Sequence, residues 1–202
     1  MDNILYSEKK IAIFNGIIAL MRKGVNPYSI KVSDIAKEAD IGKGTVYDYF
    51  ASKEEAISQA ILFNIREEIE EAYYRIKAKN GFKEKYYELL HIIAERMESN
   101  IFPFKVLLSA GGIQKFYEYI SEYKYDMCQH VSRINIIYDH MLETGVEEKI
   151  IGEEEDSYYR YMAIASAVMG FSQYFGQRTF NQNISIEEAA EASYKLLIKA
   201  LN

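Results

Sequence analysis

Side chains that could contact nucleic acid are concentrated in one short stretch of this chain. Lys43 is a cation that can reach a guanine edge or a phosphate, and Thr45 and Tyr47 carry hydroxyls that can bond phosphate oxygens. Gly44 has no side chain at a point where backbone could approach a duplex closely. Lys53 lies at the start of a predicted helix, where backbone N–H groups and the helix dipole favour phosphate. These types and spacings are typical of a DNA-binding surface.

The elements that must position these side chains are two short helices and a turn within residues 32–56. The first helix points Ile35 and its small neighbours inward, residues 40–42 interrupt the pattern, and a second helix follows. Val46 and Phe50 are four residues apart, so both face the interior. The side chains left outside or on the rim are those of Lys43, Thr45, Tyr47, Asp48 and Tyr49.

This stretch resembles the N-terminal DNA-binding domain of the TetR/AcrR transcriptional regulators. The residues that carry the resemblance are Ile35-Ala36, Gly44-Thr45-Val46-Tyr47, Tyr49-Phe50 and Ser52-Lys53-Glu54. The resemblance spans about residues 10–60 and implies an all-α, TetR-like fold. We expect a three-helix, helix-turn-helix DNA-binding domain over residues 1–51. A ligand-binding and dimerisation domain of about six helices is expected over residues 52–202. An ordinary tight helix pair is the alternative for the motif alone, because such pairs occur in many folds.

The chain departs from the family pattern near the turn. Asp40 stands where members usually have glycine, and Gly42 replaces a hydroxyl cap, so the turn costs slightly more and the second helix is capped more weakly. Lys31 replaces another capping hydroxyl, which leaves Ser33 as the nearby candidate for phosphate binding. Asp48 can accept a hydrogen bond from cytosine N4 but repels phosphate, so it either reads sequence or points aside.

Composition favours a folded, cytoplasmic protein. The 202 residues are 49% apolar, which is ample for cores, and no segment approaches the roughly 18 consecutive apolar residues of a membrane span. Polar and acidic residues interrupt the start of the chain where a signal peptide would need an apolar block. Cys128 is the single cysteine, so an internal disulfide is excluded and a cysteine-based metal site is not expected.

The net charge of −6 is unevenly distributed. Residues 1–60 carry eight Lys/Arg and eight Asp/Glu, so the excess of acid belongs to the rest of the chain. Local patches would then steer DNA binding, and an acidic body would limit non-specific adhesion to nucleic acid.

Apolar periodicity and helix-stop residues predict further helices and no strands. The expected helices cover residues 7–23, 52–78, 82–99, a shorter one beginning at 100–103, 113–143, 156–178 and 185–201, with a loop at 145–152. The helix over 52–78 would join the two domains without a flexible linker, so its tilt would move the recognition helix directly.

Small residues recur on the penultimate helix at Ala163, Ala167 and Gly170, which permits close helix packing. Such a strip is more often core within one chain, but the resemblance implies a homodimer built from the last two helices. The residues expected at this interface are Ala163, Ala167, Gly170, Phe171, Ala190 and Leu197.

Aromatic residues and methionines in the middle helices suit an adaptable, largely apolar cavity. The candidate ligand contacts are Phe102, Phe104, Leu107, Phe116, Met127, His130, Met141 and Tyr174. Neighbouring glutamates would suit a lipophilic cation, but a solvated helix face explains them equally well.

Catalytic and metal sites are not expected, and no cofactor is implied. Glu88 and His91 have the spacing of a di-iron bundle ligand pair, but such a site needs two pairs. Cys128 and His130 diverge on one helix, so they do not form a nucleophile–base pair.

The sequence therefore predicts a homodimeric, effector-responsive DNA-binding transcriptional regulator. Its expected partners are a palindromic operator in double-stranded DNA, a second copy of the chain and a small, largely apolar effector. We expect a repressor that the effector releases from the operator, with no membrane partner. The alternative is a helical small-molecule carrier or interaction module that no longer binds an operator; Asp40, Gly42 and Asp48 keep this alternative open.

Overall fold

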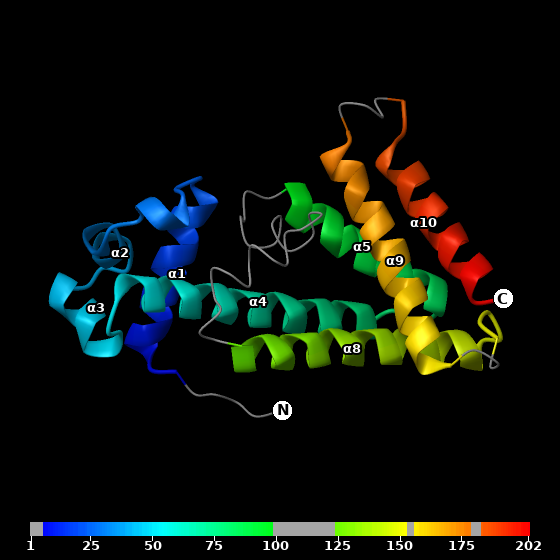
Figure 1. Ribbon diagram of the computed structural model, residues 1–202, viewed down its shortest axis with the longest axis horizontal. Helices are drawn as coiled ribbons and strands as arrows, with labels where there is room; N and C mark the ends of the chain where they lie inside the picture. The colour runs from blue at the N-terminus through cyan, green and yellow to red at the C-terminus, as the bar shows by residue number, and fades with distance from the viewer. Residues whose placement is uncertain (1–5, 99–123, 153–155, 179–182) are drawn as a thin grey trace.

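The computed structural model describes residues 6–98, 124–152, 156–178 and 183–202, with Tyr28 and residues 124–129 described by backbone alone. Within these ranges the chain is helical and contains no strand, which confirms the expected all-α class. The helices are α1 (Glu8–Arg22), α2 (Val32–Glu38), α3 (Lys43–Tyr49), α4 (Lys53–Lys77), α5 (Phe82–Glu98), α8 (Lys124–Glu147), α9 (Ser157–Gly176) and α10 (Ile186–Ala200), with a 3-10 turn η1 (Pro27–Ser29) (Figure 1). In the described parts, no helix is both long enough and apolar enough to cross a bilayer.

The N-terminal helices pack around Phe14 of α1. Its ring lies 5.1 Å from that of Phe63 on α4 and 5.8 Å from that of Phe50, which follows α3. Gly16 lets α2 approach closely, because a Cβ at this position would lie only 3.2 Å from the backbone nitrogen of Ala39. A single small core therefore fixes the helix-turn-helix on α1 and α4.

Helix α4 runs without interruption from the helix-turn-helix to the larger helical body (Figure 1). It begins where a serine cap was expected: Ser52 Oγ accepts a hydrogen bond from the backbone N–H of Glu55 at 3.0 Å. The Glu55 carboxylate in turn accepts from the backbone N–H of Ala51 at 2.7 Å. Because α4 packs against α1 at one end and against α5 and α8 further along, it belongs to both packing units.

A chain of buried hydrogen bonds links three helices of the larger body. The Tyr86 hydroxyl on α5 lies 2.7 Å from Ser193 Oγ on α10, and Ser193 Oγ donates to the carbonyl of Ala167 on α9 at 2.8 Å. Tyr86 is fully buried, and burial raises the pKa of its hydroxyl above its ordinary value. These bonds satisfy polar groups that would otherwise be unpaired in the core.

Helix α8 extends further than the sequence indicated. The expected helix ended at residue 143 with a loop from Gly145, but α8 continues through Gly145 to Glu147. It then closes with the backbone N–H of Ile150 bonded to the Gly145 carbonyl at 2.9 Å and with Lys149 at a positive φ of 58°. This is a Schellman end in which lysine occupies the left-handed position that glycine usually takes.

Gly145 is required by packing rather than by a turn. A Cβ here would lie 2.5 Å from Ile151 Cδ1 and 3.0 Å from Phe82 Cδ2. We expect Gly145→Ala to destabilise the fold by about 1–3 kcal/mol through overpacking, despite alanine's higher helix propensity. Chemical denaturation measures this, with Gly176→Ala as control because nothing lies within 4 Å of a Cβ there. An unchanged free energy of unfolding for Gly145→Ala would contradict the packing.

Candidate nucleic-acid interface and internal cavity

Helix α3 presents one face to the core and the other to solvent. Val46 and Phe50 are 1% and 2% exposed, as their spacing predicted. On the other face Lys43 and Gly44 are exposed, and Tyr47 is 54% exposed. A Cβ on Gly44 would meet nothing within 4 Å, so the fold itself does not require glycine there.

The turn before α3 accommodates the departures from the family pattern. Asp40 adopts a positive φ of 53°, the left-handed conformation that glycine would take more easily. The N–H of Ile41 donates to the Ala36 carbonyl at 3.0 Å and that of Asp40 to the Lys37 carbonyl at 3.3 Å, which closes α2 with a Schellman end. Gly42 caps α3 without a side-chain hydrogen bond, as expected from the missing hydroxyl.

The remaining candidates surround the exposed face of α3 or its ends. Ser33 is exposed on the first turn of α2 with its hydroxyl 3.5 Å from the Asp34 carboxylate, and Asp48 is also exposed. Thr45 and Tyr49 are half-buried along the rim of α3. Lys53, at the start of α4, is partly buried, with its ammonium 3.5 Å from a Glu54 carboxylate oxygen. Both positively and negatively charged side chains therefore border the exposed face of α3.

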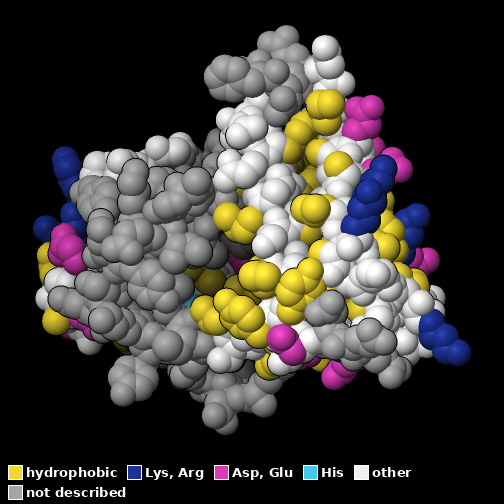
Figure 2. All heavy atoms as spheres, turned by 45° about the vertical axis from the view of Figure 1, so that its right-hand side comes forward, with side chains coloured by type: hydrophobic (Ala, Val, Ile, Leu, Met, Phe, Trp, Pro, Cys, Tyr) yellow, Lys and Arg dark blue, Asp and Glu magenta, His cyan; other side chains and the backbone are white. Residues whose placement is uncertain are grey.

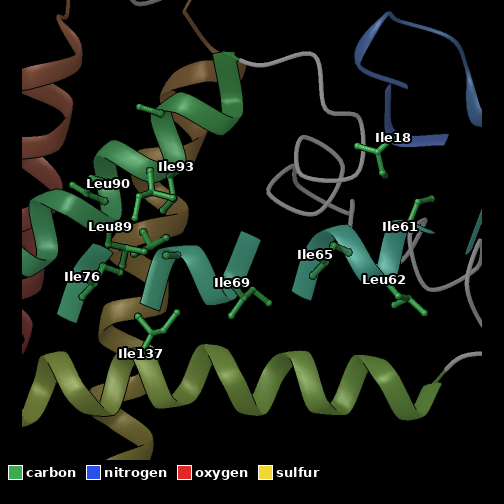
Figure 3. Packing of buried hydrophobic residues seen from close by; sticks show 14 of the residues in the cluster. Ile18, Ile61, Leu62, Ile65, Ile69, Ile76, Leu89, Leu90, Ile93 and Ile137 are labelled. Carbon is green, nitrogen blue, oxygen red and sulfur yellow. The ribbon is translucent and has the colours of Figure 1, made fainter. Parts of the chain in front are cut away.

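An apolar cavity of about 100 Å³ lies between α4, α5, α8 and α9. Figure 3 shows some of its side chains, with Ile65 and Ile69 from α4, Leu89 and Ile93 from α5 and Ile137 from α8. The described residues that line the cavity are Ile65, Glu68, Ile69, Ala72, Leu89, Ile92, Ile93, Ile134, Ile137, Tyr138 and Val168. The sequence did not indicate these residues, because aliphatic side chains on four helices carry no mark that separates a cavity wall from a filled core.

Among the described residues that line the cavity, Glu68 is the single carboxylate. Its side chain is 7% exposed and forms an ion pair with Arg96 of α5, which also bonds Glu71 at 2.7 Å. Burial raises the pKa of Glu68 above its ordinary value, and the Arg96 charge opposes this shift. The pair links α4 to α5 at the edge of the cavity.

The predicted ligand contacts are only partly within the described residues. Phe102, Phe104, Leu107 and Phe116 lie outside them, as does the side chain of Met127. His130, Met141 and Tyr174 are buried, and the Tyr174 hydroxyl donates to the Ile184 carbonyl at 3.1 Å. None of these three belongs to the cavity wall described above.

The Glu88 and His91 side chains each lie against charged side chains of α5 or the end of α4. Glu88 binds Arg75 at 2.8 Å and Lys79 at 3.1 Å, and His91 lies 3.0 Å from Glu95. These carboxylates therefore serve the packing of α4 on α5. Within the described ranges, no group of three or more His, Cys, Asp or Glu side chains could hold a metal ion.

The small-residue strip on α9 faces in two directions. Ala163, Ala167 and Phe171 are buried within the chain, as are Ala190 and Leu197 of α10, so these five pack inside one copy. Gly170 is exposed, and a Cβ on it would meet nothing within 4 Å. The outward face of α9 instead carries Met162, Ser166 and Gly170, each four residues apart.

Exposed apolar residues continue from this face of α9 onto α10. Met162, Ile184 and Leu196 are all exposed, and a groove of about 290 Å³ runs past Gly170, Ala189, Ala192 and Leu196. Figure 2 shows hydrophobic side chains gathered on this side of the molecule. An apolar patch of this kind on a folded chain marks an interaction surface.

The fold and the exposed α3 face together define a helix-turn-helix protein with a helical second domain. Residues 24–59 match the family described as bacterial regulatory proteins, tetR family. This match confirms the resemblance of the helix-turn-helix segment to the tetR family of bacterial regulatory proteins. No match was found among curated proteins.

Solved structures share the fold along nearly the whole chain. The fatty acid degradation regulator FadR from Bacillus halodurans is 15% identical with a TM-score of 0.65, covering 98% of each chain. FadR from Bacillus subtilis, in complex with stearoyl-CoA, is 18% identical with a TM-score of 0.64, covering 95% of this chain and 99% of that one. A TetR family transcription regulator from Marinobacter aquaeolei VT8 is 14% identical with a TM-score of 0.57, covering 96% and 95%.

Proposed function

We propose that this chain is a homodimeric transcriptional repressor that a small, largely apolar effector releases from a palindromic operator. The observation that carries the proposal is the exposed face of α3, where Lys43, Gly44 and Tyr47 project from a helix anchored by Val46 and Phe50. Residues 1–51 would bind DNA, and residues 52–202 would bind the effector and the second copy. A DNA-binding regulator of this kind acts in the cytoplasm.

The DNA contacts proposed for each copy divide by chemistry. Thr45 and Tyr47 would bond phosphates, Lys43 would reach a phosphate or a guanine edge, and Gly44 would allow close backbone approach. The other proposed contacts are Ser33, Asp48, Tyr49 and Lys53. Because phosphate contacts carry no sequence information, losing them should weaken binding to all duplexes alike.

Removing single hydroxyls from α3 tests this interface. We expect Tyr47→Phe and Thr45→Val each to weaken DNA binding several-fold, about 0.5–1.5 kcal/mol for one lost hydrogen bond, with melting temperature unchanged. Fluorescence anisotropy with operator and scrambled duplexes measures the effect. Tyr158→Phe is the matched control, because Tyr158 is 76% exposed on α9, far along the chain from α3. Parent-like affinity for both α3 variants would place the DNA surface elsewhere.

The proposed dimer interface is the outward face of α9 and α10, with Met162, Gly170, Ile184, Ala192 and Leu196 at its centre. Two copies related by a two-fold axis would pack these helices as a four-helix bundle and cover the apolar groove. Such symmetry also matches two recognition helices to the two halves of a palindrome.

A bulky side chain at Gly170 should separate the copies. Gly170→Leu finds open space within one chain, so the monomer should fold, whereas the added side chain should block close helix packing between copies. We expect sedimentation to show monomer or a weakened dimer, together with reduced operator affinity. Glu187→Leu adds the same side chain at an exposed position of α10 outside the proposed interface and should leave the dimer intact. A parent-like dimer in Gly170→Leu would contradict this interface.

Effector binding would act through α4. The cavity is lined by Ile65, Ile69 and Ala72 of this helix, and the same helix carries Phe63 into the N-terminal core. An effector that favours a different tilt of α4 would change the spacing of the two recognition helices and lower operator affinity. The fold shared with a regulator solved in complex with stearoyl-CoA supports an effector with an aliphatic chain.

A further inference from the structure

His130 of α8 is a buried polar side chain without a hydrogen-bond partner among the described residues. Its exposed fraction is 6%, and neither Nδ1 nor Nε2 is bonded to any of the described residues. Buried imidazole nitrogens are normally bonded to protein or water, so this ring has hydrogen-bonding capacity that the described residues do not use.

Two arginines beside this histidine share one carboxylate. Arg66 Nε lies 3.5 Å from Glu70 Oε1, and Arg133 Nη1 pairs with the same oxygen. Burial, and then the charges of Arg133 and Arg66, lower the pKa of His130 to about 4, so its ring is neutral near neutral pH. Two guanidinium groups against one carboxylate leave a net positive charge around a neutral ring that can donate one N–H.

This cluster adjoins the end of the apolar cavity. His130 lies one helical turn before Ile134, and Ile137 follows on the same face of α8; both isoleucines line the cavity. On α4, Arg66 directly follows Ile65 and lies one turn before Ile69, which also line it. The positive cluster therefore continues a wall that is otherwise almost entirely aliphatic.

We propose that the cavity and the cluster of His130, Arg66 and Arg133 form one site for an anionic amphiphile. The aliphatic chain would lie among the isoleucines, and a carboxylate or phosphate head would accept hydrogen bonds from His130 and the guanidinium groups. This inference rests on the proposed function, since it names the chemistry of the effector. The cavity of about 100 Å³ is smaller than the cavity of about 150 Å³ that holds a benzene, so it admits a chain of only a few carbons.

Calorimetric titration of the full chain without DNA tests the ligand class. The probes are butanoate, butyl phosphate and 1-butanol, which share a chain and differ in the head group. We expect at least one anion to bind about tenfold or more tightly than the alcohol, because the alcohol cannot form charge-assisted hydrogen bonds. The anion that binds more tightly shows whether the site prefers a carboxylate or a phosphate head group. If the alcohol binds as tightly as both anions, or if none binds, the proposal is wrong.

Two variants test the assigned residues. His130→Leu removes a buried polar group that no described residue bonds, so we expect an equal or higher melting temperature together with about tenfold weaker anion binding and unchanged butanol binding. If His130 only filled the core, His130→Leu would not weaken anion binding while the melting temperature is maintained. Arg133→Met should also weaken anion binding, while Arg178→Met, which breaks an exposed pair with Glu98, should not. Parent-like anion affinity in both His130→Leu and Arg133→Met would overturn the assignment.

Operator binding by the ligand-free chain, measured separately, distinguishes failure of the proposed ligand class from failure of the proposed repressor function. Normal operator binding without anion preference overturns the ligand class alone. Anion preference without any operator binding overturns the repressor and leaves a binding protein for anionic amphiphiles.

Discussion

Phe50→Ala should abolish operator binding although Phe50 does not face the DNA. The side chain is 2% exposed, ends α3 and packs its ring 5.8 Å from that of Phe14. Truncation of a buried phenylalanine costs about 3–5 kcal/mol, a large part of the stability of a domain this small. We therefore expect the N-terminal helices to open while the larger body stays folded. Hydrogen exchange would show protection lost in residues 8–50 and retained in α5 and α9.

Tyr49→Ala provides the matched control for this variant, because Tyr49 adjoins Phe50 but lies half-buried on the rim. It should reduce DNA affinity with much smaller loss of protection in α1. If Phe50→Ala keeps full protection throughout the N-terminal helices, Phe50 is not a core residue. The contact of Phe50 with Phe14 would then not be what orients α3.

Arg96→Met should destabilise the larger body strongly, because it leaves the Glu68 carboxylate in the cavity wall without its guanidinium partner. The side chains of Glu68 and Arg96 are 7% and 17% exposed, so solvent screens the pair little. Breaking a buried pair on one side costs about 3–5 kcal/mol. Chemical denaturation at neutral pH measures the loss.

The pH dependence and a second substitution identify the cause. Burial already raises the pKa of Glu68, and loss of Arg96 would raise it further, so the folded state would hold the proton more tightly than the unfolded state. Stability then improves as the pH falls, and the deficit of Arg96→Met should shrink between about pH 8 and about pH 5. Adding Glu68→Leu should restore most of the stability, since an apolar pair can replace a buried ion pair. A deficit that is independent of pH and unrelieved by Glu68→Leu would show that Arg96 acts by packing alone.

Local signals in the sequence predicted most helix starts correctly. Ser52, Asp156 and Ser185 each precede a helix and accept a hydrogen bond from a backbone N–H three residues later, at 3.0, 2.8 and 3.1 Å. This chemistry depends on four consecutive residues, so it can be recognised without knowledge of the fold. The same holds for the inward spacing of Val46 and Phe50.

Features that depend on contacts between distant segments were not predictable in this way. On α9, small or apolar residues occupy both the inward and the outward face, so Ala163 and Met162 could not be assigned to different sides from the sequence. Gly145 is a helix-stop residue by type, yet it lies inside α8 because Ile151 and Phe82 fill the space of its side chain. The cavity combines residues more than 100 positions apart, and periodicity carries no information about such a combination.

The most direct test of the repressor is a DNA titration of the unmodified protein. A duplex from the region upstream of its own coding sequence and a scrambled duplex are titrated at two salt concentrations, with fluorescence anisotropy as the readout. We predict tighter binding to the native duplex and a steep loss of affinity at higher salt, because phosphate contacts release condensed counterions. Equal affinity for both duplexes, or no binding at low salt by a folded dimer, would contradict operator recognition and favour the small-molecule carrier.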